Sequence, residues 1–360
     1  MTPSYFIWNG KDSEQMGLWV SQYPDRVRAE ERMTQVAVPS RSGRFYLSEG
    51  TAIYEPISIY IRVQCRADID LEPLNDWLSG EGVLVLGYEP NRCYKARVIQ
   101  EVDFGKISND LLEGQIRFEC DPFKKAYPTE KKITLTAHPD KNVFNKNATD
   151  TSNGYVANAY LAHEGAIVPN DPDLDISEYI PVRANTTYTV NPVSTSVFIC
   201  YYDANHNYIG EGSYPATWGE FVSQTITTPT NTAYVRISVI KEKLDETQLE
   251  LGSTATAYEP YVLICNGTVE NKGTVPAYPV IKITGDGDIS LTCNGIPFAI
   301  TDMDTSVTLD SGARIALDDD GANCLEKTSG TFPVLQRGMN QIGWTGDVTS
   351  VEITRNQRWK

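Results

Sequence analysis

The stretch Phe6-Ile7-Trp8-Asn9-Gly10-Lys11-Asp12-Ser13, followed by Gly17-Leu18-Trp19-Val20, decides how the chain begins. Two apolar segments flank Asn9-Gly10. This dipeptide favours a tight hairpin, because both residues tolerate the positive φ that the turn requires. Shortly afterwards, Val36-Ala37-Val38-Pro39-Ser40-Arg41-Ser42-Gly43 predicts another short strand with a glycine-containing turn. Neither stretch carries catalytic chemistry, so we expect a folding and assembly module here.

The rest of the first third predicts an antiparallel β domain with a single helix. Apolar and polar residues alternate over residues 57–65 and again over 115–120, as in strands with one buried face. Between them, residues 70–80 take helical spacing, with Asp70 placed to cap the start and Gly80 to follow the end. Residues 83–86 predict a short buried strand.

Length and charge narrow the class of protein. The chain has 360 residues, of which 41% are hydrophobic and 22% charged, so it has enough apolar material for two or three folded domains. Its formal net charge of −16 argues against recognition of nucleic acid and against adsorption to anionic membranes. No apolar run approaches the roughly 18 residues of a membrane span, and Met1–Ser4 does not open a secretory signal.

The reactive residue types favour a protein that is not an enzyme. The cysteines are scattered without a C-x-x-C pair, so we expect buried free thiols rather than disulfides or a zinc site: Cys65, Cys93, Cys120, Cys200, Cys265, Cys293 and Cys324. His138, His163 and His206 lack ligand spacing, and we expect no metal and no cofactor. A glycoside hydrolase stays open as the alternative, because two catalytic carboxylates among 47 acidic residues leave no local pattern.

Several motifs in order resemble the distal tail protein (Dit) family of long-tailed siphophages. They are Phe6 to Gly17, Pro39-Ser40-Arg41-Ser42-Gly43, Leu74 to Gly80, Glu89-Pro90-Asn91-Arg92-Cys93-Tyr94 and Phe118 to Phe123. The family's usual Pro-Gly-Arg-x-Gly has Ser40 at its second position here. The resemblance implies an N-terminal β-sandwich with one helix that assembles into a hexameric ring at the tail tip.

The last hundred residues predict a second all-β domain. Gly285-Asp286-Gly287-Asp288 predicts a hairpin turn, and short strands recur at even spacing up to residue 353. The Gly-Asp-Gly-Asp element, the Phe332 to Asn340 segment and Arg358-Trp359 resemble the C-terminal galectin-like β-sandwich of the same family. Galectin-like describes a fold and does not by itself imply sugar binding.

The middle of the chain, residues 142–261, differs in composition and is rich in Asn, Thr, Ser and Tyr. We expect a whole domain inserted into the C-terminal one, with strands near 187–190, 197–202, 208–209 and 233–240. Its closing Gln248 to Ser253 and Thr256 to Tyr261 segments resemble carbohydrate-binding modules grafted into phage tail proteins, which implies a jelly-roll-like β-sandwich.

Aromatic residues of this insert are the candidate carbohydrate-binding residues. Sugar rings pack their C–H faces on aromatic planes, and their hydroxyls bond to Asn, Asp and Tyr groups. Tyr214 and Trp218 are the leading candidates, followed by Tyr155 and Tyr160. Any of them can equally be a core or strand residue. The alternating carboxylates of the acidic run 171–175 could ligate calcium, but the run lacks the glycine and distal Glu of an EF-hand loop, so a solvated loop is the better interpretation.

The sequence therefore predicts a mainly β protein with three domains. These are a ring-forming domain at 1–128, a galectin-like domain at 129–141 plus 262–360, and an inserted carbohydrate-binding module at 142–261. The expected function is a structural hub in the virion tail tip of a siphophage or prophage, made in the bacterial cytoplasm. The expected partners are further copies of the chain, the tail tube protein, the tail-associated tip protein, a receptor-binding protein and host cell-wall polysaccharide.

Overall fold

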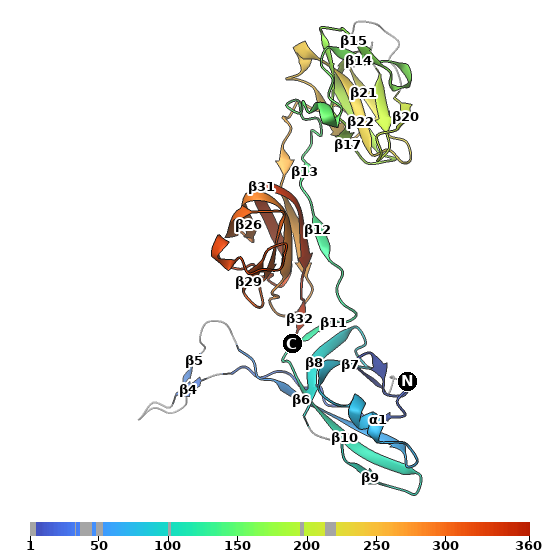
Figure 1. The fold of residues 1–360 in the computed structure, drawn as a ribbon, viewed down its shortest axis with the longest axis vertical. Coiled ribbons are helices and arrows are strands. Elements are labelled where there is room, and N and C mark those ends of the chain that lie inside the picture. The colour runs from blue at the N-terminus through green and yellow to red at the C-terminus, as the bar shows by residue number, and fades with distance from the viewer. Residues whose placement is uncertain are drawn as a thin grey trace. The chain divides into compact units, whose positions relative to one another are not determined.

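The described chain forms two compact units of antiparallel β-structure. The computed structural model describes residues 5–32, 34–36, 45–47, 53–99, 102–194, 198–212 and 221–360. Unit 1 comprises Met1–Thr136 and Asn266–Lys360, and unit 2 comprises Ala137–Cys265. Over these ranges α1 (Glu72–Trp77) is the only α-helix, and the predicted mainly β fold is confirmed (Figure 1). No helix of the described part is long and apolar enough to cross a membrane.

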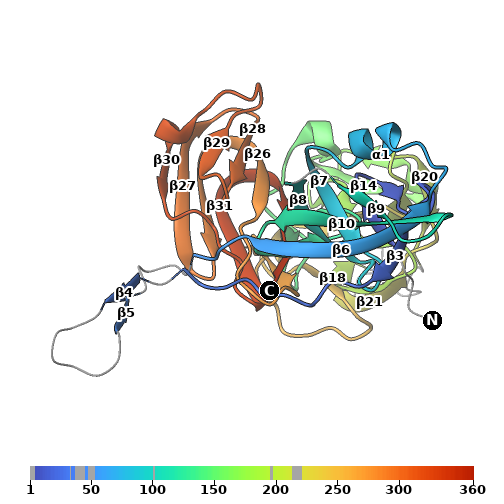
Figure 2. The ribbon, with the colours of Figure 1, turned by 90° about the horizontal axis from the view of Figure 1, so that it is seen from below.

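The N-terminal part of unit 1 is a ten-stranded sheet, with the main order β2-β1-β7-β8-β10-β6-β3. Figure 2 shows the two longest of these strands, β6 and β10, side by side. The strands are β1 (Phe6–Trp8), β2 (Lys11–Asp12), β3 (Trp19–Gln22), β6 (Ile57–Arg66), β7 (Glu81–Leu86), β8 (Arg92–Val98), β9 (Phe104–Lys106), β10 (Leu111–Cys120), β11 (Lys124–Ala126) and, from the end of the chain, β32 (Arg358–Trp359). A separate ribbon pairs β4 (Thr34–Val36) with β5 (Phe45–Leu47).

Local sequence explains the first elements of this sheet. Asn9 and Gly10 adopt φ values of 49° and 79° between β1 and β2, so the predicted hairpin is confirmed. The glycine-containing turn expected after Val36 lies outside the described residues. The alternation in β6 and β10 buries Ile61, Ile116 and Phe118 on one face, as expected.

Helix α1 is attached to the first strand by two tryptophans. The indole Nε1 of Trp8 donates to the carbonyl of Trp77 at 2.9 Å, and Nε1 of Trp77 donates to the carbonyl of Trp8 at 3.1 Å. Phe6 stacks on Trp77 with ring centroids 5.7 Å apart. Asp70 is not the N-cap residue, because that position is taken by Leu71. The carboxylate of Asp70 still accepts the amide hydrogen of Glu72, the first residue of the helix, at 3.1 Å.

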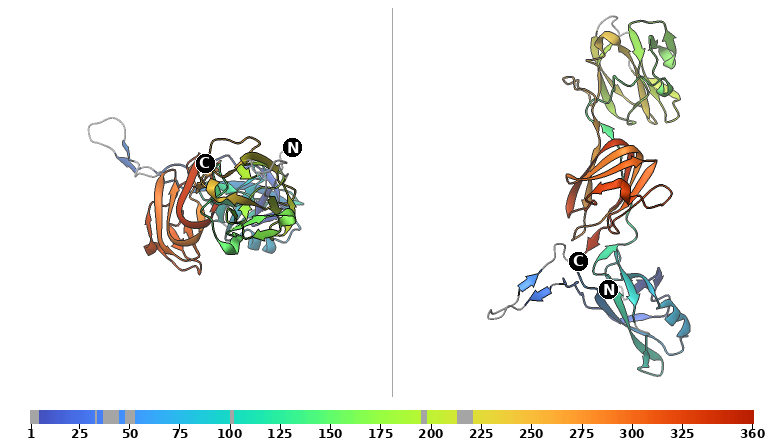
Figure 3. Two further views of the ribbon diagram at one scale, coloured as in Figure 1. Left: turned by 90° about the horizontal axis from the view of Figure 1, so that it is seen from above. Right: turned by 60° about the vertical axis from the view of Figure 1, so that its left-hand side comes forward.

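The C-terminal part of unit 1 is an eight-stranded sheet built on two long strands, β26 and β31. Figure 3 shows the strands of this sheet, in orange and red, as strongly curved. The elements are β12 (Ile133–Leu135), β25 (Asn266–Asn271), β26 (Val280–Cys293), β27 (Ile296–Met303), β28 (Ser306–Asp310), β29 (Ile315–Leu317), η4 (Leu325–Lys327), β30 (Thr328–Gly330) and β31 (Gly338–Thr354). After β31 the chain returns to the ten-stranded sheet, where β32 pairs with β11.

The hairpin turn expected at Gly285 to Asp288 is wrong. These residues lie inside β26, which pairs with β31 across them with shifts of register. A Cβ at Gly285 would lie 2.1 Å from the carbonyl oxygen of Asp347, so the glycine permits a close approach of the two strands and not a reversal of the chain. Glycines at turns and at bulges look alike in sequence, so the Gly-Asp-Gly-Asp pattern alone does not distinguish the two.

Unit 2 is a sandwich with a third, smaller layer. A five-stranded sheet has the main order β16-β22-β19-β20, and a three-stranded sheet has the order β21-β18-β23. The elements are β13 (His138–Pro139), η1 (Thr151–Asn153), β14 (Ala159–Leu161), η2 (His163–Gly165), β15 (Ile167–Pro169), β16 (Leu174–Ile176), β17 (Ile180–Pro181), β18 (Thr187–Ser194), β19 (Ile199–Tyr202), β20 (Tyr208–Glu211), β21 (Phe221–Thr227), β22 (Tyr234–Ile240), η3 (Lys241–Lys243), β23 (Gln248–Leu251) and β24 (Leu263–Ile264).

Both faces of the five-stranded sheet are buried. Val235, Ile237 and Val239 of β22 belong to a core shared with the three-stranded sheet. On the opposite face, Cys200 and Tyr202 of β19 belong to a second core that includes the β14–β15 hairpin. The hairpin therefore covers a sheet face that a simple two-layer sandwich leaves open.

The chain leaves and re-enters unit 1 at neighbouring points. A Cβ on Gly267 would lie 2.8 Å from Cδ2 of Leu135, so the segments before and after unit 2 touch within unit 1. Within unit 2, β13 pairs with β24, His138 opposite Ile264. The expected division into three domains, with the insert at 142–261, stays a prediction; the two compact units divide at Ala137 and Cys265.

The cysteines are all free thiols. Six are buried, as expected, whereas Cys265 is half-buried. Burial raises the pKa of Cys120 and of Cys200 to about 12, so neither thiol is a nucleophile at neutral pH.

Candidate functional site

The four aromatic residues expected to bind sugar have different surroundings. Tyr214 and Trp218 lie outside the described residues. Tyr155 is half-buried, and its hydroxyl donates to Oδ2 of Asp175 at 2.8 Å. Tyr160 lies on β14, half-buried against the main core of unit 2. Over the described part, Tyr155 and Tyr160 therefore contribute to packing and to one polar contact.

The acidic run 171–175 does not form a cluster of ligands. The carboxylate of Asp171 accepts the amide hydrogen of Asp173 at 3.0 Å. Asp175 lies in β16, where Oδ1 accepts the amide hydrogen of Asn158 at 2.8 Å and lies 3.2 Å from Nζ of Lys241. Among the residues that the structure describes, no three His, Cys, Asp or Glu side chains are placed to hold a metal ion.

A group of aromatic rings that the sequence interpretation missed gathers at the β19–β20 turn of unit 2. The ring of His206 stacks on Tyr179, with centroids 3.8 Å apart and planes 2° from parallel. Tyr202 meets Tyr179 edge-on at 5.0 Å, and Tyr234 meets His206 at 4.8 Å with the planes 72° apart. His206 is exposed, whereas Tyr179 and Tyr234 are half-buried.

The turn that carries His206 is held by one carboxylate. Oδ1 of Asp203 accepts the amide hydrogens of Asn205 and Asn207 at 2.8 and 2.9 Å, and Oδ2 accepts the side-chain amide of Asn207 at 3.0 Å. The hydrogen bond from the Asn207 side chain lowers the pKa of Asp203 below its usual value. His206 has a φ of 62°, which places its ring over Tyr179.

A buried cation lies beneath the aromatic group. Arg236 of β22 is 3% exposed, and its Nε donates to the carbonyl of Ser177 at 3.2 Å. A second hydrogen bond runs from the guanidinium to the carbonyl of Gly154. The guanidinium lies 4.9 Å from the ring centroid of Tyr179. The ring of Tyr179 therefore contacts both the imidazole of His206 and the guanidinium of Arg236.

A second polar group surrounds Glu211 at the end of β20. Oε1 of Glu211 lies 2.6 Å from Nδ1 of His163, and Oε2 accepts the amide hydrogen of Glu164 at 3.0 Å and the hydroxyl of Tyr208 at 3.1 Å. Burial raises the pKa of Tyr208 to about 12, and the bond to Glu211 adds to the shift. Glu211 therefore fixes η2 against β20. His163 and His206, expected as isolated surface residues, both have ring or carboxylate partners.

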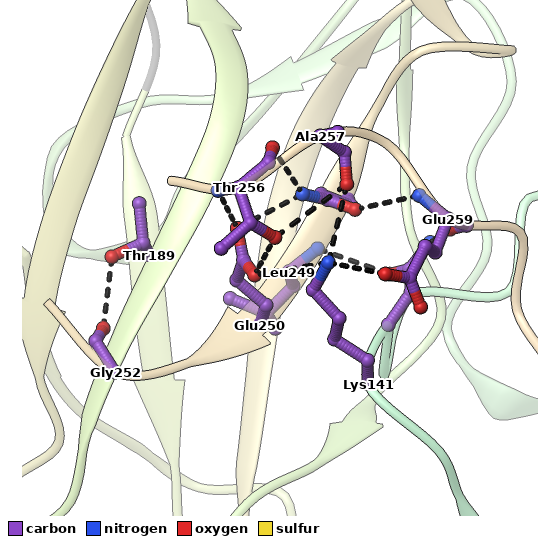
Figure 4. A network of polar contacts seen from close by, with 10 residues as sticks. Lys141, Thr189, Leu249, Glu250, Gly252, Thr256, Ala257 and Glu259 are labelled. Atoms are coloured by element: carbon purple, nitrogen blue, oxygen red, sulfur yellow. Dashed lines mark hydrogen bonds and ion pairs between the residues drawn. The ribbon is translucent and has the colours of Figure 1, made fainter. Parts of the chain in front are cut away.

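The closing motif of unit 2 forms a polar network that ties its two ends together (Figure 4). Glu250 is 2% exposed, and it accepts hydrogen bonds from the amide and the hydroxyl of Thr256, each at 2.7 Å. Oε1 of Gln248 accepts the amide hydrogen of Glu259 at 3.1 Å. Nζ of Lys141 lies 2.6 Å from Oε1 of Glu259. The residues that carry the resemblance to carbohydrate-binding modules thus help to hold the two ends of unit 2 together.

A polar groove in unit 1 lies beside an open strand edge. β10 pairs with all ten residues of β6, but β3 pairs only with Arg62, Val63 and Gln64 on the other edge. A groove of about 390 Å³ runs beside the rest of that edge, lined by residues 22–25, Val27, Ser58 to Tyr60, Arg62 and Gln115. Within the described chain, the Tyr23 hydroxyl and Nε of Arg117 are buried without a hydrogen-bond partner. Such groups and edges favour contact with another chain.

No family model matches the chain, and no curated protein matches it. Among solved structures, it is similar to the Dit protein of phage SPP1, described as a paradigm of the hub adsorption apparatus in phages infecting Gram-positive bacteria. The TM-score is 0.51 at 10% identity, over 99% of each chain. A structure of the phage P2 baseplate in its activated conformation aligns with 99% of this chain and 97% of that chain, at 10% identity and a TM-score of 0.26. The resemblance to Dit is thereby confirmed at the level of fold.

Proposed function

We propose that this chain, which has the fold of a Dit protein, is a structural component of a siphophage or prophage tail. The observation that carries the proposal is the fold similarity over 99% of both chains, together with the ordered Dit-like motifs in the sequence. In this role the chain joins the tail tube to the tail-associated tip protein and to a receptor-binding protein. It is incorporated into the virion at the tail tip after synthesis in the bacterial cytoplasm, and it acts as a scaffold and not as an enzyme.

The N-terminal part of unit 1 forms a closed ring of six copies through a head-to-tail contact. A head-to-tail contact closes into a ring when its rotation divides a full turn. The open edge of β6 and the two buried unpaired polar atoms beside it support this surface as part of the contact. The side chain of Arg62 is exposed there and lines the groove.

Electron microscopy and light scattering of the full chain test the ring, with and without the neighbouring tail protein. We expect six-fold rings, and we expect Arg62→Glu to shift the population towards monomers. Lys106→Glu is the matched control, because Lys106 is also exposed but does not line the groove. Monomers under both conditions at high concentration would count against the ring.

Unit 2 binds host cell-wall polysaccharide during adsorption, with Trp218, Tyr214, Tyr160 and Tyr155 as its candidate residues. The support is the resemblance of its closing segments to carbohydrate-binding modules and the aromatic group at the β19–β20 turn. The full chain is expected to bind purified walls, a chain lacking 137–265 to lose this binding, and Trp218→Ala to weaken it. Equal binding without unit 2 overturns the proposal, and release of reducing sugars would identify a hydrolase instead.

A further inference from the structure

We propose that the outer face of the His206 ring is the surface on which unit 2 stacks an uncharged sugar ring. The inference rests on the proposed saccharide binding and names its site and ligand class. Arg236, Tyr179 and His206 form a connected group, here called the column, in which the guanidinium lies 4.9 Å from the Tyr179 ring centroid and the imidazole stacks on that ring at 3.8 Å. The column begins with a buried cation and ends with an imidazole whose far face is turned away from Tyr179.

The position of Tyr234 leaves that face open. Its centroid lies 4.8 Å from His206 and 5.9 Å from Tyr179, with planes near 70° to both. If the Tyr234 ring covered the outer face of His206, its distance to Tyr179 would be much larger than its distance to His206, and the two distances are similar. Tyr234 therefore stands beside the two stacked rings and forms a wall next to the imidazole. An exposed flat ring with an aromatic wall is a concave corner that fits the edge and one face of a pyranose.

The column is held in place before any ligand arrives. Asp203 fixes the turn through three hydrogen bonds, so the imidazole is not a freely rotating surface side chain. Gly154, at a φ of 93°, leaves room for Tyr179, because a Cβ there would lie 2.6 Å from its ring. Binding to a rigid platform loses little side-chain entropy, which favours a weak ligand such as a sugar.

Charge decides which saccharides suit this surface. Residues 137–265 contain 15 acidic side chains against 6 basic ones, so unit 2 repels phosphate-bearing polymers. Arg236 does not compensate at the surface, because it is buried and bonded to carbonyl groups. Exposed amides of Asn205 and Asn207 flank His206 and offer hydrogen bonds to hydroxyl groups. These features favour neutral sugars, which have C–H faces and hydroxyls but no charge.

The chain has only three histidines, which makes a direct test possible. In full-length protein labelled with ¹³C-histidine, imidazole signals report His138, His163 and His206 separately. The probes are a neutral glucan, N-acetylglucosamine oligomers and a glycerol-phosphate teichoic acid, together with neutral polysaccharide from the purified walls that the chain binds. We expect a neutral saccharide to shift the His206 signals and leave those of His138 unchanged. A larger response to teichoic acid, or a shift confined to His163, overturns the inference.

The matched variants are His206→Asn and His163→Asn. Asparagine tolerates the left-handed conformation at 206, so the turn is kept while the ring is removed. We expect His206→Asn to weaken neutral saccharide binding about three- to tenfold, the usual value of one aromatic contact, and His163→Asn to leave it unchanged. Equal binding by His206→Asn and the unaltered chain overturns this inference but leaves saccharide binding standing. Absence of binding by the unaltered chain to walls and to every probe overturns both.

Discussion

At the scale of single residues, Asn142 shows how much of unit 2 depends on one side chain. Asn142 is 1% exposed, and its Oδ1 accepts the amide hydrogens of Phe144 at 3.0 Å and Leu249 at 3.1 Å. Its Nδ2 donates to the carbonyl of Glu259 at 3.1 Å. One amide thus connects the first segment of unit 2 to β23 and to the segment that follows it.

Asn142→Ala is expected to destabilise unit 2 by about 2–3 kcal/mol, because it leaves buried backbone groups without partners. Hydrogen–deuterium exchange of the full chain checks this: amides of β23 and residues 142–144 should exchange faster, while those of β26 and β31 stay protected. Asn145→Ala is the control, since the side chain of Asn145 accepts a local hydrogen bond from the amide of Asn147 two residues later. Equal protection of β23 in both variants would contradict the role of Asn142.

Residue patterns in the sequence predicted some of these positions and missed others. The closing motif is identified by its resemblance to carbohydrate-binding modules, and its residues Gln248, Glu250 and Thr256 contact one another over a short stretch of sequence. His206 could not be recognised in this way. Its stacking partner, Tyr179, belongs to a different loop, and the contact exists only once β19 and β22 have paired. The available sequence signal was the turn pattern Asp-x-x-His-Asn at residues 203–207, which places a histidine at the tip of a hairpin.

At the scale of elements, α1 is too short to be stable alone and depends on its contacts with β1. It has six residues, fewer than an isolated helix needs in water. Leu74 and Trp77 are its buried residues, and Trp77 both stacks on Phe6 and exchanges hydrogen bonds with Trp8. The helix therefore exists because β1 provides its partners.

Trp77→Ala should lower the stability of the N-terminal part of unit 1 by about 3–5 kcal/mol, as expected for removal of a buried tryptophan. Trp77→Phe keeps the stacking on Phe6 but loses the indole hydrogen bond, so a smaller loss is expected. Urea unfolding followed by exchange of β6 and β10 amides measures both. Trp19→Ala serves as the control, because Trp19 is 44% exposed. A loss for Trp19→Ala as large as that for Trp77→Ala would contradict this account.

Elements with a strong local period were predictable, and those defined by distant contacts were not. The alternation of β6 and the Asn9-Gly10 turn were predicted because burial on one face and positive φ act on neighbouring residues. The β14–β15 hairpin was not predicted. Its strands have three residues each, too few for a period, and they are held by packing on a sheet face that the sequence does not identify.

At the scale of the whole molecule, the two units are connected so that each can close on its own. The segments on either side of unit 2 touch within unit 1, at Leu135 and Gly267. The first and last strands of unit 2, β13 and β24, pair with each other. The network around Glu250 then fastens these ends within unit 2.

Removal of residues 137–265, with Thr136 joined to Asn266 through a short glycine linker, is expected to leave unit 1 folded. The expected result is unchanged protection of β26 and β31 amides, and the isolated 137–265 segment should show cooperative thermal unfolding of its own. If unit 1 loses protection in the deletion variant, the two units share stability, and the description of unit 2 as an insert is wrong.

The mainly β class and the resemblance to Dit could be predicted from the whole sequence, because motif order and composition extend over the chain. Ring size and partners depend on surfaces formed by several chains. The groove beside β6 combines residues near 23, 60 and 117, and only the folded sheet brings them together. The position of a contact between copies therefore cannot be recognised in any one stretch.

The contact between Leu135 and Gly267 places the two cut ends of unit 1 side by side, where a domain can be inserted. A compact domain whose own termini lie close together can be inserted at this position without distortion of the sheet in unit 1. Replacement of the domain at this position therefore alters what the chain carries and leaves the fold of unit 1 unchanged.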